Sequence, residues 1–506
     1  MNSEVAITPK EDLSTEIQDL LQNSEIQELT RVVRKNIGLA IVYGEQHTTQ
    51  GFSEAEDSEK SFVGELDKLD DSIVNPKIEK AKEEHAETID MYGITDDDLR
   101  GMFEKVWIYS RLKNPTNELL EEAISTLEGT EATAVFSSGL AAISAVVDQF
   151  VPAHIFIPKK GLLDSVRNKL AKLVPSVVKS KNNGEYIKGG KVVVIGAIYG
   201  GTYAQMQHTF KGTGRQFEHL TINQFLKEGL PEDADMVFFE ASNNPNLNVA
   251  PIAEIVEEAK RVGAVTVCDN TFTPITVKPS ELGVSLTVHS MTKSIGGRSE
   301  DLGGSVSGNT EMISRFLGLH DGERMLRGGV LAPRVAKEFL KNMEDLPERL
   351  YIAAGQARAL KDVAEKHSIK AKLTEDDKRF AGIRSDVPKE LGNGMVNITF
   401  DSAEEAHAFV DAMIEEEIGL NAVSLGATTT YYSIPAETTH SEMPAEEQIK
   451  ANIEPSMVRV SCGTEEDLVA KFEKVIRKIK GISEEDSSPL ARSFFHKTGQ
   501  ILQKVA

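Results

Sequence analysis

Two side chains that could do chemistry, Asp269 and Lys293, each follow a short apolar segment rich in β-branched residues. The segments span residues 264–268 and 284–288, and polar residues come directly after both. In an open α/β sheet the carboxyl ends of the strands form the ligand-binding edge, so we expect these side chains to meet there. An imine-forming lysine, a carboxylate for a ring nitrogen and donors for a phosphate are what a pyridoxal 5′-phosphate (PLP) site requires. Residues 264–307 therefore predict a PLP site.

Each of these two residues also has an ordinary structural explanation. A lysine in a loop rich in Ser, Thr and Gly is usually a solvated surface charge, and Asp before Asn often starts a turn. The context of Lys293 favours chemistry, because Ser290 and Thr292 alternate with it at a strand end. Partial burial there would lower the pKa of its amine. Asp269 would hold a bound ring nitrogen in its protonated form through a charge-assisted hydrogen bond.

Three further segments could complete such a site, and each keeps a structural alternative. Residues 137–140 lie between a predicted strand and a predicted helix, where free N–H groups can bind a phosphate or a serine can simply cap the helix. Tyr199 precedes a Gly-Gly turn and could stack on a planar cofactor or serve only in packing. Arg459 alternates with valines in residues 457–461, so it could clamp a substrate carboxylate or face water.

The composition excludes several classes of protein. The net charge of −23, from 79 acidic and 56 basic residues, would repel nucleic acid and anionic membranes. Two cysteines, Cys268 and Cys462, cannot form a disulfide framework, and Cys268 fits a core position. No segment matches a signal peptide or a membrane span. We expect a cytoplasmic protein without a metal site, a nucleic-acid partner or a membrane partner.

From about residue 96 onward, apolar segments alternate with amphipathic ones. Strands that are apolar throughout and alternate with helices indicate a mainly parallel sheet covered on both faces. Predicted strands are 133–136, 155–157, 192–195, 236–239, 395–400 and 457–461, and predicted helices are 118–127, 139–150, 403–417 and 465–479. Another helix is expected from about Ala250, with Pro251 in its first position and Gly263 at its end.

We predict four regions along the chain. Residues 1–95 form an acidic extension, helical or partly disordered, with helices expected at 13–23 and 25–37. Residues 96–345 form a large cofactor domain, in which the locally basic residues 158–190 look like an insertion of a helix and a loop. Residues 346–482 form a smaller C-terminal α/β domain, and residues 483–506 form a tail.

Eight segments, in order, resemble the Cys/Met-metabolism PLP enzymes, which include cystathionine γ-synthase, cystathionine γ- and β-lyases, methionine γ-lyase and O-acetylhomoserine sulfhydrylase. They are YSRLKNPTNELLEEAISTLEG (109–129), FSSGLAAISA (136–145), YGGTY (199–203), EASNNPNLNVAPI (240–252), CDNTFTPI (268–275), HSMTKSIGGRSEDLGG (289–304), AVSLGATTTYYSIPAETTH (422–440) and VRVSCGTEEDL (458–468). The resemblance spans about residues 100–482. It implies a fold-type I PLP enzyme, with a large, mainly parallel seven-stranded sheet and a smaller C-terminal α/β domain.

The resemblance also implies roles for individual residues. Lys293 would bind the cofactor covalently and move protons, and Asp269 would pair with the ring nitrogen. Tyr199 would stack on the ring, and Asn244 would contact the ring's 3′-oxygen and the substrate. Residues for the phosphate would be Ser138, Gly139, Leu140, Ser290 and Thr292, joined by Tyr109 and Arg111 of a neighbouring subunit. Arg459 and Ser424 would orient the substrate carboxylate and the lysine, and Tyr109 or Tyr199 would assist the leaving group.

The implied activity is γ- or β-elimination or replacement on an amino acid derived from homoserine, methionine or cysteine, in a homodimer with shared sites or a homotetramer. Several departures indicate a divergent branch. Gly201 stands where methionine γ-lyases usually carry a cysteine, and Val423 where cystathionine-specific enzymes usually carry a glutamate. Arg298 and Glu300 are atypical of the loop after the lysine. Two alternatives stay open: a PLP enzyme acting at Cγ of a non-sulfur amino acid, and a catalytically silent regulatory homologue.

Overall fold

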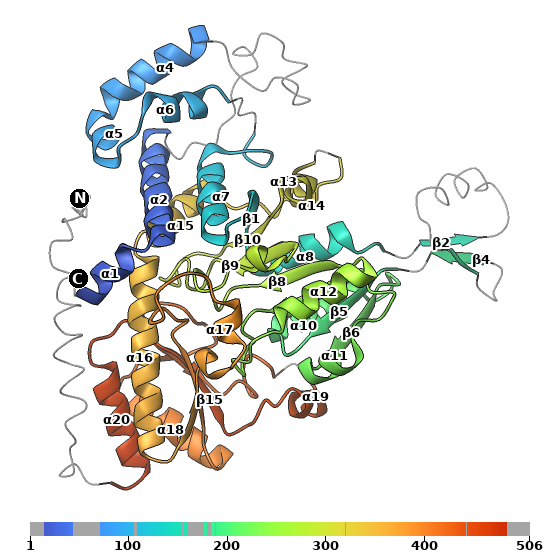
Figure 1. Ribbon diagram of the computed structural model, residues 1–506, viewed down its shortest axis with the longest axis vertical. Helices are drawn as coiled ribbons and strands as arrows, with labels where there is room; N and C mark the ends of the chain where they lie inside the picture. Colours follow the sequence, from blue (N-terminus) through green and yellow to red (C-terminus); the bar gives the residue numbers. More distant parts are fainter. Residues whose placement is uncertain are drawn as a thin grey trace.

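The computed structural model shows an α/β chain with two main sheets (Figure 1). It describes residues 15–43, 71–105, 109–153, 155–158, 177–179, 184–187, 189–318, 320–441 and 443–482. The predicted tail at 483–506 lies outside these ranges, as do parts of the predicted extension and insertion. Within the described ranges, no helix combines the length and apolar character that crossing a bilayer requires.

The larger sheet has seven strands in the order β1-β10-β9-β8-β7-β5-β6. Neighbours from β9 to β6 pair in parallel, whereas β10 is antiparallel to both β9 and β1. The strands are β1 (Ala132–Phe136), β5 (Lys191–Ile195), β6 (Gln216–Leu220), β7 (Met236–Glu240), β8 (Val265–Asp269), β9 (Leu286–Ser290) and β10 (Gly304–Gly308). This sheet confirms the predicted fold class of a mainly parallel, seven-stranded α/β architecture.

Both faces of this sheet are covered, which explains why its central strands are apolar throughout. Along β5, Val192 and Val194 enter one core with α8, while Val193 and Ile195 enter a second core with α11 and α12. Helix α12 begins one residue later than expected, because Pro251 is its N-cap rather than its first helical residue. The helices of this part are α7 (Pro115–Glu128), α8 (Gly139–Phe150), α10 (Gly200–Thr209), α11 (Ile222–Glu228), α12 (Ile252–Val262), α13 (Thr310–Ser314), α14 (Glu323–Arg327) and α15 (Pro333–Met343).

The smaller sheet has five strands in the order β11-β12-β15-β14-β13 and lies beside the long helix α16 (Figure 1). One apolar core joins this sheet to α16, α18 and α20. The strands are β11 (Lys370–Lys372), β12 (Met395–Thr399), β13 (Leu420–Asn421), β14 (Tyr431–Ser433) and β15 (Met457–Ser461). The helices are α16 (Leu346–Lys366), α17 (Phe380–Ile383), α18 (Ala403–Glu415), α19 (Ala445–Lys450) and α20 (Leu468–Ile479).

The described part of the N-terminal region is helical and joins the core of the protein. Helix α2 packs against α7 and α15, and its apolar side chains, Val33 and Ile37 among them, share one buried cluster with those helices (Figure 1). The helices here are α1 (Thr15–Leu21), α2 (Ser24–Tyr43), α4 (Asp71–Glu84), α5 (Ala86–Tyr92) and α6 (Asp96–Phe103). Burial of one amphipathic face against the sheet domain stabilises this extension.

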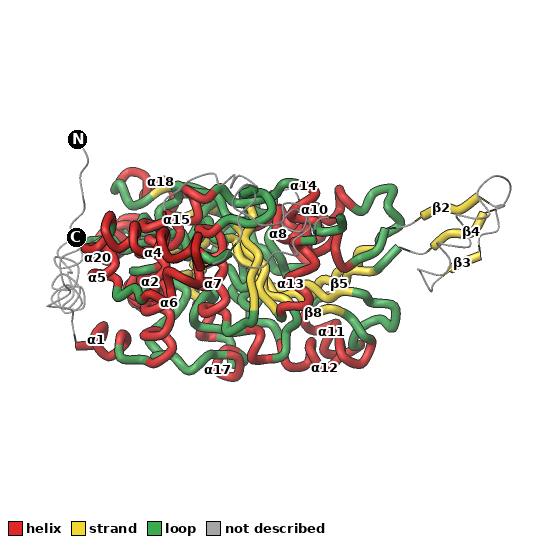
Figure 2. The backbone as a smooth tube through the Cα atoms, turned by 90° about the horizontal axis from the view of Figure 1, so that it is seen from above, coloured by secondary structure: helices red, strands yellow, loops and turns green. Residues whose placement is uncertain are grey.

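The predicted strand at 155–157 forms but does not join the larger sheet, and one strand of that sheet was missed. Residues 155–157 form a strand, but β2 (Ile155–Pro158) pairs with β4 (Gly184–Ile187) and through it with β3 (Val177–Lys179), in a separate antiparallel sheet that projects from the body (Figures 1 and 2). Within the predicted insertion, residues 177–179 and 184–187 form strands, while residues 159–176, 180–183 and 188, on which the predicted helix and loop mostly fall, lie outside the described ranges. Strand β10 was missed because its sequence, GSVSG, has little apolar character. Small residues are needed there, since a Cβ on Gly304 would lie 2.2 Å from the carbonyl oxygen of Ser138.

Candidate active site

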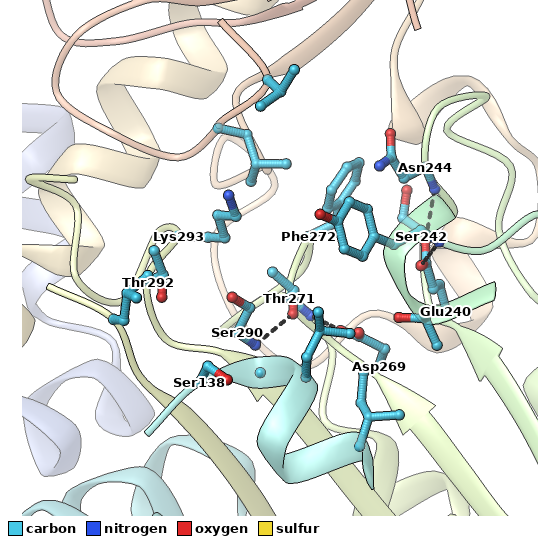
Figure 3. A pocket seen from close by; sticks show the side chains of 18 of the residues that line it. Ser138, Glu240, Ser242, Asn244, Asp269, Thr271, Phe272, Ser290, Thr292 and Lys293 are labelled. Atoms are coloured by element: carbon cyan, nitrogen blue, oxygen red, sulfur yellow. Dashed lines mark hydrogen bonds between the residues drawn. The ribbon is translucent and has the colours of Figure 1, made fainter. Parts of the chain in front are cut away.

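One pocket of about 230 Å³ opens at the carboxyl ends of β7, β8 and β9, which end at Glu240, Asp269 and Ser290. Figure 3 shows side chains from these strand ends converging on it. The pocket brings together most of the predicted site residues, namely Ser138, Gly139, Leu140, Tyr199, Asn244, Asp269, Ser290, Thr292, Lys293 and Arg459. Ser424 does not line the pocket but accepts a hydrogen bond from Lys293. The strand-end argument therefore correctly placed these side chains at one edge of the sheet, and their functional roles stay predictions.

Lys293 lies in the turn after β9 and is largely enclosed. Its Nζ donates a hydrogen bond to Ser424 Oγ, at 3.1 Å. Burial, with the nearby charge of Arg459 as a second cause, lowers the pKa of the Lys293 amine to about 8. A substantial fraction of this amine is therefore neutral near physiological pH, and only a neutral amine can act as a nucleophile or a base.

Arg459 is buried rather than facing water, with 1% of its surface exposed. Its guanidinium donates to Asn244 Oδ1 at 2.9 Å and to the carbonyl oxygen of Ser424 at 3.2 Å, while its Nε has no hydrogen-bond acceptor among the described residues. Burial lowers its pKa to about 10, so the side chain stays charged at neutral pH. A buried cation whose side chain lines a pocket is suited to bind a carboxylate.

Two carboxyl groups stand side by side at the floor of the pocket. Glu240 and Asp269 are register partners on the neighbouring strands β7 and β8. Burial raises the pKa of Glu240, and the charge of Asp269 raises it further. Burial likewise raises the pKa of Asp269, against hydrogen bonds from Thr271, whose N–H donates to Asp269 Oδ1 at 3.0 Å. A cationic group placed in the pocket would stabilise the ionised form of this pair.

Sequence reasoning missed Glu240 as a site residue. It is 6% exposed, and its two carboxyl oxygens accept hydrogen bonds from the backbone N–H of Tyr199 at 2.6 Å and of Asn244 at 2.8 Å. Glu240 thereby fixes the positions of two loops that reach the pocket, as Figure 3 shows for Asn244. The sequence did contain a signal for Glu240, because this residue directly follows the predicted strand at 236–239 just as Asp269 follows the apolar segment at 264–268.

Behind Asp269 lies a buried polar network that the sequence did not reveal. His289 Nε2 lies 2.6 Å from Glu128 Oε1, and the amide of Asn270 donates to the same carboxyl oxygen at 3.1 Å. The neighbouring His289 lowers the pKa of Asp269, against the larger effect of burial. Since His289 and Glu128 are almost completely buried, this network anchors β8 and β9 to the C-terminal end of α7.

The opposite end of the pocket has the donors that a phosphate requires. Helix α8 begins at Gly139, and Ser138 caps it by accepting a hydrogen bond from Ala141 N–H at 3.1 Å. The capping and phosphate-binding explanations are therefore compatible, because the first helical N–H groups remain available. Ser290 and Thr292 place their hydroxyl groups at the same pocket. Figure 3 shows Ser138, Ser290 and Thr292 on one side of it.

Tyr199 lies at the mouth of the pocket, with 42% of its surface exposed. A Cβ on Gly201 would lie 2.5 Å from Tyr199 Cε1, so the ring occupies the space that a side chain at residue 201 would take. The outer wall is apolar, formed in part by Leu302 and Val423, which are 67% and 57% exposed.

Tyr109 and Arg111 do not line this pocket in the single chain. The guanidinium of Arg111 donates to the carbonyl oxygen of Met325 at 3.2 Å and lies 5.6 Å from the centre of the Tyr109 ring. Their role across a subunit interface stays a prediction. Arg298 forms an ion pair with Asp345 at 3.0 Å and does not line the pocket.

The residues of the pocket fit PLP. The fit rests on the chemistry of the donor set: a buried amine with a depressed pKa, two adjacent buried carboxyl groups with raised pKa values, helix N–H groups with two hydroxyls, and a buried arginine that lines the pocket. Lys293 would hold the aldehyde carbon, Asp269 the ring nitrogen, and the start of α8 the phosphate.

Comparisons with known proteins agree with this geometry. The family model described as Cys/Met metabolism PLP-dependent enzyme matches residues 87–163 and 184–477, which leaves α1, α2 and α4 outside the match. Methionine gamma-lyase of Arabidopsis thaliana is 29% identical over 387 residues, covering 74% of this chain and 79% of the relative. Cystathionine gamma-lyase of Bacillus subtilis (strain 168) is 27% identical over 383 residues, covering 73% and 89%.

Solved structures show the same fold. Cystathionine gamma synthase from Xanthomonas oryzae pv. oryzae, in complex with cystathionine, superposes with a TM-score of 0.62 at 24% identity, covering 75% of this chain and 90% of that one. A Campylobacter jejuni protein described as an O-acetylhomoserine (thiol)-lyase, which contains N′-pyridoxyl-lysine-5′-monophosphate, gives a TM-score of 0.60 at 24% identity, covering 76% and 92%. Because the family model spans most of the sequence, the chain belongs to the Cys/Met metabolism PLP-dependent enzymes, and its cofactor is pyridoxal 5′-phosphate.

Proposed function

We propose that this enzyme catalyses γ- or β-elimination or replacement on an amino acid derived from homoserine, methionine or cysteine. The observation that carries the proposal is the placement of Lys293, an amine with a lowered pKa that is hydrogen-bonded to Ser424, in a pocket shared with the buried cation of Arg459. The curated relatives are lyases of methionine and cystathionine, which supports this range of substrates.

The residues divide the work by position. PLP, when bound, supplies an electron sink for negative charge at the substrate α-carbon. Arg459 binds the substrate carboxylate through its guanidinium, while Asn244 and the Ser424 carbonyl hold that group in place. Lys293 accepts the α-proton and, for γ-elimination, also takes a proton from Cβ, with Ser424 Oγ orienting its Nζ. Asp269 stabilises positive charge at the ring nitrogen, and Tyr199 is placed to donate a proton to the leaving group.

The apolar mouth favours substrates with an uncharged side chain. Charged lining side chains are confined to the inner pocket, at Glu240, Asp269, Lys293 and Arg459. The second ammonium and carboxylate of cystathionine would meet Leu302 and Val423 instead of countercharges within the described chain. Desolvating such charges without partners is costly, so O-acetylhomoserine and methionine fit this wall better.

A substrate panel tests the proposal. O-acetylhomoserine, cystathionine, methionine and cysteine are assayed separately for release of keto acid and thiol, and O-acetylhomoserine is also assayed with a thiol acceptor. We expect activity on O-acetylhomoserine or methionine with a higher kcat/KM than on cystathionine, and Val423→Glu to shift the ratio towards cystathionine. No activity on any of the four would refute the sulfur assignment.

We also propose that the enzyme is a homodimer, or a tetramer built from such dimers, in which Tyr109 and Arg111 complete the phosphate site of the neighbouring subunit. The support is that neither residue reaches the pocket of its own chain. Mixing the inactive variants Lys293→Ala and Arg111→Ala after dissociation should restore up to about a quarter of wild-type activity, because hybrid dimers contain one intact site. No recovery in assembled hybrids would contradict shared sites.

A further inference from the structure

A second pocket, with a volume of about 550 Å³, lies at the carboxyl ends of β5 and β6. Its walls come from β6, α10 and the start of α11, from the turn at residues 243–248, and from Ala451 and Asn452 after α19. Carboxamide side chains dominate it, and no aspartate or glutamate is among the described residues that line it. In a chain with 79 acidic residues, a pocket this size with one arginine and no carboxylate is locally suited to an anion.

The hydrogen bonds of three carboxamides show what they can offer a ligand. Asn243 Oδ1 accepts from the N–H of Asn248 at 2.9 Å, Gln224 Oε1 accepts from the N–H of Thr221 at 2.8 Å, and Asn248 Oδ1 accepts from the ammonium of Lys372. Each oxygen is thus engaged, and the three NH₂ groups donate to no described residue. These side chains therefore present donors to the pocket.

Arg379 adds a cationic donor to the same pocket. Its Nε and one terminal nitrogen bind the carboxylate of Asp377 at 3.0 and 2.7 Å, which leaves its other terminal nitrogen unbonded among the described residues. His219 instead supplies an acceptor. Its Nε2 lies 2.7 Å from the carbonyl oxygen of Gly196 and must donate to it, so Nδ1 of the neutral ring is free to accept a hydrogen bond. The pocket combines several donors with an acceptor.

We propose that this amide pocket, defined by Gln224, Asn243, Asn248, Arg379 and His219, binds a small carboxylic acid that also carries a hydroxyl or amino group. The carboxylate would accept hydrogen bonds from the carboxamide NH₂ groups and the guanidinium, and the hydroxyl or amino group would donate to the imidazole. The aromatic edges of Tyr203 and Phe217, whose ring centres are 5.5 Å apart, would pack against the carbon skeleton.

The position of the pocket makes it an effector site. One short turn serves both pockets, because Asn243 and Asn246 line the amide pocket while Asn244 lines the active site and accepts a hydrogen bond from Arg459. The turn is closed by the pairing of Ser242 with Val249, and Asn246 ties it to the backbone of Ala451. A ligand that fixes Asn243 therefore biases the position of Asn244, and through it the carboxylate-binding Arg459.

Equilibrium dialysis of the holoenzyme with labelled L-lactate tests the site. This probe has the carboxylate and hydroxyl but no amine that could react with PLP, so it separates the amide pocket from the catalytic reaction. We expect saturable binding of one molecule per chain in Arg459→Gln, which lacks the active-site cation, and of at least one molecule per chain in the wild type. Absence of saturable binding, or its loss in Arg459→Gln, would overturn the proposal.

Two isosteric variants locate the ligand. Asn248→Asp keeps the acceptor for Lys372 and Gln224→Glu keeps the helix cap, but each replaces a donor by a negative charge. Both should weaken L-lactate binding at least about tenfold, because a like charge then faces the carboxylate. Asn421→Asp, at an exposed residue of β13, should bind as wild type. Unchanged L-lactate binding in either pocket variant, with its PLP absorbance intact, would refute the assignment, so one well-folded variant is enough for the test.

Discussion

Replacing Lys293 by methionine should stabilise the cofactor-free protein, most strongly near neutral pH. Burial holds the pKa of Lys293 at about 8, against 10.5 for an ordinary lysine. Below about pH 8 the folded state must carry a buried ammonium, which costs about 3 kcal/mol near pH 7, since one pKa unit corresponds to about 1.4 kcal/mol. Methionine has a similar length and no charge. The variant loses the hydrogen bond to Ser424, which reduces its gain in stability by about 1 kcal/mol.

The pH dependence carries the sharper prediction. Between about pH 8 and 10.5 the unfolded chain binds more protons at this lysine than the folded chain does, so the stability of the wild type rises with pH there. From near pH 7 to near pH 9.5 the advantage of Lys293→Met should shrink by about 2 kcal/mol. Urea unfolding of both cofactor-free proteins at the two pH values measures this difference. Parallel stabilities at both pH values would refute the argument that Lys293 is buried with a depressed pKa.

Three other substitutions probe the surroundings of the site. Burial lowers the pKa of His440 to about 4, so acid should destabilise the wild type between about pH 6.5 and 4. In urea unfolding, His440→Gln should remove up to about 3 kcal/mol of that loss. Equal acid sensitivity of the two proteins would contradict this. Gly201→Ala should displace the Tyr199 ring and weaken PLP binding about fivefold by fluorescence titration, whereas unchanged affinity would show that the ring does not stack on the cofactor. Glu128→Gln should destabilise the protein by about 3 kcal/mol, and by less in a His289→Gln background. If the losses in stability from the two substitutions are additive, Glu128 and His289 are not coupled.

Local patterns made the cofactor site predictable. The strands before Asp269 and Lys293 are short apolar segments with polar ends, and a parallel sheet brings such ends to one edge whatever the remaining connections are. The helix at 139–150 was predictable to the residue, because Ser138 and Gly139 mark its start and its apolar residues recur at helical spacing.

Features that depend on distant partners were not predictable. Alternation in its strand left open whether Arg459 clamps a carboxylate or faces water, and only contacts with Asn244 and Ser424, far apart in the chain, show that it is buried. Strand β2 has the apolar pattern of a central strand, yet it pairs with β4 within the same projecting segment. The burial of α2 against α7 and α15 depends on a tertiary partner that helical periodicity alone does not identify.

The central claim is that Lys293 holds the cofactor at the edge formed by β7, β8 and β9. Borohydride reduction of the holoenzyme, followed by proteolysis and mass spectrometry, tests it directly, because reduction makes the bond between PLP and its lysine permanent. We predict one pyridoxyl group per chain on the peptide that contains Lys293, and no specific labelling in Lys293→Ala. A pyridoxyl group on any other lysine, with Lys293 unmodified, would contradict the claim.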